Sequence, residues 1–162
     1  MIKSLIVKRI EEAITENELS AYYKQDGADF VAGTCAFIVR LYRTDLSQFK
    51  WNSETCEAAI RLLDKLKEKD TSAPGMVLPS KSQLKRIITA NKDRSLVKYY
   101  FNSTLSYNAR IMFSVLKLLG ACKGEFVNVT GYTCGADKLK MEVWGLRITS
   151  KNGEALIMPF KA

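Results

Sequence analysis

The sequence contains no histidine, and its cysteines are scattered without a C-x-x-C pair. Without an imidazole, the Ser-His and Cys-His arrangements of nucleophilic catalysis are excluded. A zinc site would need thiolates and carboxylates at unsuitable spacings, so we expect no metal and no other cofactor. The cysteines are interpreted as small buried side chains. These absences favour a non-enzymatic protein, and a small enzyme that acts through lysine, tyrosine or carboxylate groups is the alternative.

Long apolar runs and targeting segments are also missing. No run approaches the roughly 18 apolar residues of a membrane-spanning helix. The N-terminal stretch breaks its apolar residues with Lys8 and Arg9 and lacks a small-residue cleavage site. Neither glycine-rich motif that cradles phosphates, G-x-x-x-x-G-K-[ST] or G-x-G-x-x-G, is present. We therefore predict a cytoplasmic protein with no membrane partner.

Positive charge is present in excess and is unevenly distributed. The net charge is +8, and residues 74–98 alone carry 6 Lys/Arg against 1 Asp/Glu. The stretch KSQLKRIITANKDR supplies Lys81, Lys85 and Arg86, followed by Lys92 and Arg94. Such a group can neutralise phosphates without reading bases, which favours nucleic acid as a partner. A solvated loop is the alternative interpretation of the same stretch.

The apolar pattern predicts an α+β fold in a single domain that spans residues 1–162. We expect one half over residues 1–73, a connecting segment over residues 74–94, which contains two Pro and a Gly, and a second half over residues 95–162. Each half is expected to place a helix against antiparallel strands. The Asp26-Gly27 pair, between two stretches rich in aromatic and β-branched residues, predicts a hairpin.

Individual elements follow from periodicity and capping signals. Helices are expected over residues 2–14, where a short strand is the alternative at the start, over 53–69 and over 107–119, where Gly120 is suited to end the helix. Strands are expected in LSAYYKQ, ADFVAG, TCAFIVRLY, LVKYYFN, EFVNVTG, KLKMEVWGLRI and EALIMPF.

The third of these helices has an unusual polar face. Arg110, Ser114 and Lys117 follow one another at i, i+4 and i+7, so the charges on that face are all positive. Such a helix can lie along a phosphate backbone. Ordinary solvation of the same face explains the pattern equally well.

The stretch SYNARIMFSVLKLLG, followed by strands and a terminal ALIMPFKA, resembles the last half-domain of the bacterial DNA sliding clamp, the processivity factor of DNA polymerase. The resemblance covers residues 105–162. It implies helices on one side of curved antiparallel sheets and two pseudo-repeated halves. It also implies that Arg110 and Lys117 face duplex DNA, and that a groove beside the C-terminus captures peptides from a DNA polymerase or other replication protein. The groove residues on this pattern are Leu156, Met158, Pro159 and Phe160.

Together these observations predict a non-enzymatic, sliding-clamp-like accessory protein of DNA replication from a bacterium, phage or prophage. Its DNA-contact candidates are Arg110, Lys117, Lys81, Lys85 and Arg86. The chain is far shorter than a three-domain clamp subunit, so a ring would need more copies than the usual dimer, and a homo-oligomer is a possible state. The alternative is a monomeric protein-interaction module with the same fold that does not encircle DNA.

Overall fold

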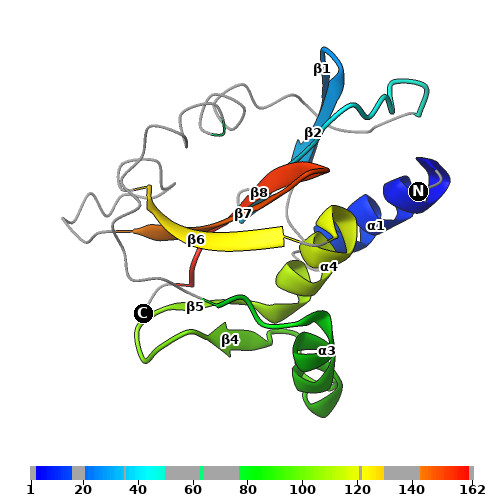
Figure 1. Ribbon diagram of the computed structural model, residues 1–162. Helices are drawn as coiled ribbons and strands as arrows, with labels where there is room; N and C mark the ends of the chain where they lie inside the picture. Colours follow the sequence, from blue (N-terminus) through cyan, green and yellow to red (C-terminus); the bar gives the residue numbers. More distant parts are fainter. Residues whose placement is uncertain are drawn as a thin grey trace.

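The computed structural model describes residues 3–15, 21–34, 36–49, 63, 77–120, 122–129 and 143–160. Helices and antiparallel strands alternate along this part of the chain, which confirms the α+β class (Figure 1). The elements are α1 (Lys3–Thr15), β1 (Tyr22–Asp26), β2 (Asp29–Gly33), β3 (Phe37–Leu41), α3 (Lys81–Ala90), β4 (Lys98–Tyr100), β5 (Ser106–Asn108), α4 (Ala109–Leu119), β6 (Cys122–Asn128), β7 (Trp144–Ser150) and β8 (Gly153–Ile157).

Six strands form one antiparallel sheet in the order β1-β2-β3-β8-β7-β6. The central pair joins β3 to β8, so the N-terminal and C-terminal strands meet in the middle of the sheet. A helix followed by three strands occurs as α1-β1-β2-β3 and again as α4-β6-β7-β8. The remaining strands, β4 and β5, form a separate hairpin.

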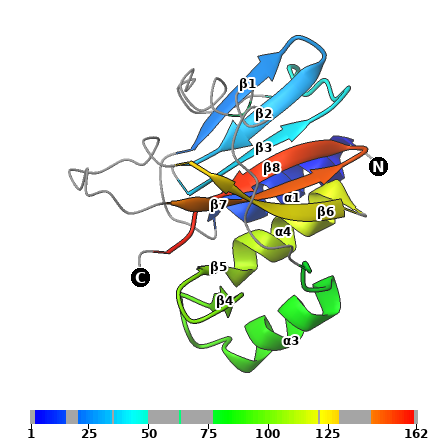
Figure 2. The same cartoon turned by 60° about the vertical axis from the view of Figure 1, so that its left-hand side comes forward.

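The helices are layered against one another as well as against the sheet. α1 and α4 lie side by side along one face, and α3 packs on α4 together with the β4–β5 hairpin, beyond the sheet (Figures 1 and 2). α4 is therefore the central helix, and 8 of its 11 residues are buried. Its N-cap is Asn108, whose side chain accepts from two backbone N–H groups, and Gly120 ends it with a φ of 73°.

Alternating strand residues divide the interior into two clusters. Phe30, Phe37 and Ile157 belong to the larger cluster beneath α1 and α4. Their neighbours in sequence Val31, Ile38 and Leu156 point to the opposite face and form a second cluster. Both faces of the sheet are therefore apolar at the centre, and both need cover.

Leu63 supplies part of that cover on the second face. It is helical and fully buried, and it packs in the second cluster. This bears out the predicted helix 53–69 at one position, while the rest of that helix lies outside the described residues. The expectation of helices on only one side of the sheet is wrong at this residue, because the second face also carries apolar side chains that must be removed from water.

Most local predictions are confirmed. The Asp26-Gly27 pair lies at the β1–β2 hairpin, where Asp26 pairs with Asp29 across a two-residue loop. The stretch EALIMPF contains all of β8 except Gly153, and β8 lies at the centre of the sheet. The expected connecting segment 74–94 needs correction, because it contains the helix α3 at residues 81–90.

Candidate nucleic-acid interface

Local sequence explains why α3 forms inside the expected linker. Ser80 is the N-cap, its side chain accepts from the Gln83 backbone N–H at 3.1 Å, and the Gln83 side chain accepts from the Ser80 backbone N–H at 2.7 Å. Leu84 is fully buried, and Ile87 and Ile88 pack half-buried against the same core. The S-x-x-Q motif and the i, i+3, i+4 apolar spacing were the signals in the sequence that identify this helix.

The opposite side of α3 is basic and exposed. Lys81, Lys85 and Arg86 lie on it, and Lys92 follows in the turn after the helix; all four are exposed. Within the described ranges, no ion pair joins any of the four to a carboxylate. We call these four residues the α3 basic surface. Asp93, directly after Lys92, is the one carboxylate in residues 77–98, so the charge of this segment is strongly positive.

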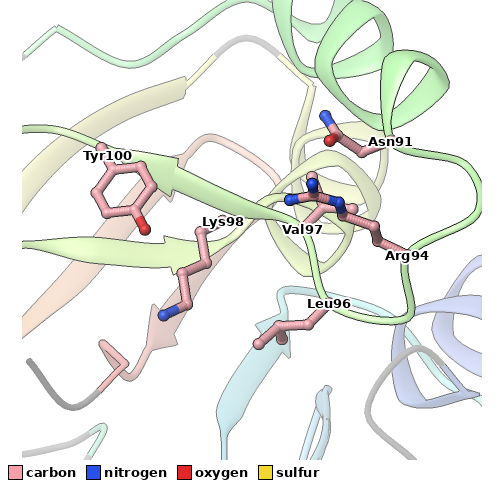
Figure 3. A pocket seen from close by; sticks show the side chains of 6 residues that line it. All are labelled: Asn91, Arg94, Leu96, Val97, Lys98 and Tyr100. Carbon is pink, nitrogen blue, oxygen red and sulfur yellow. The ribbon is translucent and has the colours of Figure 1, made fainter.

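A shallow pocket lies between the end of α3 and the strand β4 (Figure 3). Its volume is about 360 Å³, and its walls are Asn91, Arg94, Leu96, Val97, Lys98 and Tyr100. Lys98 and Tyr100 are two residues apart on β4 and extend from the same side of the strand. The pocket thus adds two further cations and an exposed aromatic ring next to the α3 basic surface.

The C-terminal segment reaches the same hairpin. The Met158 N–H donates to Ala36 O at 2.8 Å, and the Phe160 N–H donates to Ser106 O at 2.9 Å. The chain therefore passes from the sheet to β5 within three residues. There the Lys98 ammonium lies 5.2 Å from the centroid of the Phe160 ring, within the range of a cation–π contact.

The structure separates the two predicted DNA contacts on α4. Lys117 lies toward α1, where its Nζ is 3.3 Å from a Glu12 carboxylate oxygen and 4.7 Å from the Phe113 ring centroid. Arg110 lies toward the loop after α3, where it donates to Arg94 O at 2.8 Å. Both side chains are already engaged within the protein.

The predicted polar face of α4 is wrong at Ser114, which is only 5% exposed. α4 packs between α1, α3 and the sheet, so few of its side chains reach water. Arg110, Phe113 and Lys117 are its half-buried residues. The basic face expected on α4 is thus reduced to a narrow strip of half-buried residues, whereas Lys81, Lys85 and Arg86 on α3 are exposed.

The four predicted groove residues do not share one surface. Leu156 is 1% exposed and belongs to the second cluster, against which Met158 packs half-buried. Pro159 and Phe160 are half-buried on the path toward the β4–β5 hairpin. Leu156 is therefore an interior residue, and only the last three of the four reach solvent.

Cys122 lies at the start of β6, near α3. Burial raises the pKa of its thiol, and the positive charge of Lys81 opposes that rise. The thiol therefore stays protonated near neutral pH. Cys35, Cys56 and Cys134 lie outside the described residues. Among the described residues, no cluster of three or more His, Cys, Asp or Glu side chains is placed to hold a metal ion.

Comparison of the chain with protein-family models, with curated proteins and with solved structures gave no match. Of the helices in the described ranges, none has the length and apolar character needed to cross a membrane. The class that the fold and site define is therefore a basic α+β protein with an exposed cationic helix.

Proposed function

We propose that the protein is a non-enzymatic accessory protein that binds duplex DNA without sequence preference. The observation that carries this proposal is the α3 basic surface, whose four side chains are exposed and make no ion pair in the described part of the chain. Uncompensated cations bind phosphates by releasing condensed counterions, and this contribution is independent of sequence.

The geometry favours α3 over α4 as the contact with phosphates. Lys81 and Lys85 are four residues apart on one helix and therefore lie on the same side. Lys117 would first have to leave Glu12, and Arg110 would have to give up its bond to Arg94 O. Contacts made by α3 need no such exchange.

A clamp-like role in replication is the more specific form of this proposal. The resemblance over residues 105–162 supports it, as does the repeated order of a helix and three antiparallel strands. A ring would assemble from several copies of the chain and would hold DNA by encircling it. A polymerase or other replication protein would then dock at Met158, Pro159 and Phe160.

The test compares two charge-reversal variants that change the net charge equally. Lys85→Glu/Arg86→Glu removes two cations from the α3 basic surface, and Lys3→Glu/Lys8→Glu removes two exposed cations from α1. We expect the α3 variant to bind a 20-base-pair duplex at least tenfold more weakly and to lower the salt slope, d log K/d log[salt], by about 1.8, because each lost phosphate contact removes about 0.9. The α1 variant should change both quantities much less.

Equal losses in the two variants would show that net charge, and not α3, drives binding. If wild-type protein fails to bind duplex at low salt, the monomeric protein-interaction module becomes the better proposal. The half-buried Met158 and Phe160 at the C-terminal segment favour that second function. The solution mass with and without a nicked circular DNA separates a ring from a monomer.

A further inference from the structure

Strand β4 has one side toward the core and one side in water, whereas its partner β5 is buried throughout. Tyr99 packs inward, with its ring centroid 4.9 Å from that of Phe101 in an edge-to-face arrangement. Tyr100, the next residue, is 59% exposed. The Tyr100 ring is therefore accessible to a ligand from solvent.

Two cations line the same pocket as Tyr100, and a second aromatic ring lies beside one of them. Lys98 extends from the same side of β4, and Arg94 and Asn91 line the other end of the pocket (Figure 3). The Lys98 ammonium also lies over the Phe160 ring, which is half-buried. The pocket has a volume of about 360 Å³ and is open to solvent.

We propose that this pocket binds one nucleotide of an unpaired nucleic-acid strand. The base stacks on the Tyr100 ring, and Arg94 and Lys98 hold the adjoining phosphates. This inference extends the proposed function, since it takes nucleic acid as the ligand of the neighbouring α3 basic surface. Aromatic rings beside a cationic track are the arrangement by which proteins bind single strands with little sequence preference.

The ligand is an unpaired strand because a base inside a duplex has both of its faces covered by its neighbours. Only an unstacked base offers a free face to an aromatic side chain. The α3 basic surface, in contrast, needs only phosphates and serves a duplex equally well. Tyr100 therefore distinguishes the two forms of nucleic acid, whereas Lys85 and Arg86 do not.

The test measures binding of a labelled 12-nucleotide oligo-dT and of a labelled 20-base-pair duplex by fluorescence anisotropy. Tyr100→Ala should weaken oligo-dT binding by about 5-fold to 150-fold, which corresponds to the cost of one lost stacking contact. Tyr100→Phe keeps the ring and should bind nearly as wild type does. Neither variant should change duplex affinity or the salt slope. Leu5→Ala removes another exposed apolar side chain, on α1, and is the control.

The inference is overturned if Tyr100→Ala binds oligo-dT as tightly as wild type, or if it weakens the duplex and the single strand alike. Failure of the proposed function looks different, since the wild type would then not bind duplex at all. A third arm adds free dTMP as a competitor against oligo-dT. Competition at millimolar dTMP shows that the pocket accepts a single nucleotide, and Tyr100-dependent binding without competition shows that it requires a strand.

Discussion

Charged residues on the second face of the sheet form ion pairs between neighbouring strands. Arg147 on β7 contacts Glu125 on β6 at 2.9 Å and Glu154 on β8 at 3.2 Å. The Glu154 side chain is only 6% exposed, and Arg40 on β3 is its cross-strand neighbour. The charge of a carboxylate buried this deeply must be stabilised by its ion-pair partners, because water no longer solvates it.

We expect Glu154→Ala to lower the free energy of unfolding by about 3 kcal/mol, because it leaves the largely buried Arg147 without its buried partner. The matched control is Glu12→Ala, which breaks the pair with Lys117; there the two side chains are 41% and 27% exposed. That change should cost less than about 1 kcal/mol, since water solvates the separated charges. Urea unfolding at pH 7 measures both values. Similar losses would contradict a burial-dependent effect.

At the scale of one element, α3 depends on its capping box and on a single buried face. It has ten residues, of which only Leu84 is fully buried. Isolated helices of this length are marginal in water, so the first turn relies on the reciprocal bonds between Ser80 and Gln83. The order of the α3 basic surface therefore depends on this capping box.

Ser80→Ala should destabilise α3 by about 1 kcal/mol, because the backbone N–H of Gln83 loses its acceptor. Ser82→Ala is the matched control: Ser82 is exposed within the same helix and caps nothing, and alanine has the higher helix propensity. Amide hydrogen exchange should show faster exchange over the first turn of α3 in Ser80→Ala alone. Unchanged protection there would mean that packing of Leu84, and not the cap, maintains the helix.

At the scale of the whole molecule, the central strand pair joins the two parts of the chain. β3 and β8 pair over five residues, from Phe37 opposite Ile157 to Leu41 opposite Gly153. α1 and α4 also contact each other and share the larger core cluster. The described structure is therefore expected to unfold as one cooperative unit and not as two separate halves.

Gly153→Ala tests this cooperativity, because a Cβ atom there would meet the Arg40 carbonyl oxygen, which is part of the backbone of β3. We expect a loss of roughly 3 kcal/mol and a single unfolding transition in which α1 and α4 lose protection together. Gly124→Ala is the control, since the atoms nearest to its Cβ would belong to the Leu78 side chain and not to the backbone. That variant should cost about 1 kcal/mol. Separate transitions for the two parts would contradict the shared core.

The sequence by itself determined the features that depend on a few neighbouring residues. Asp26-Gly27 indicates a hairpin because a tight two-residue loop favours that pair, and Gly120 ends a helix because it adopts a positive φ at little cost. The strand within EALIMPF follows from its apolar run and flanking turn residues. The capping box of α3 is also a local signal in the sequence. The two prolines before it favoured the interpretation of residues 74–94 as a connecting segment.

Only the tertiary structure decided which charges remain exposed and which residues meet. Lys117 and Glu12 are far apart in sequence, so no local pattern shows that α1 neutralises the charge expected to face DNA. Lys98 and Phe160 come together only because the chain after β8 returns to the β4–β5 hairpin. These contacts depend on the pairing of β3 with β8. The two strands are far apart in the sequence, so the spacing of nearby residues does not predict their pairing.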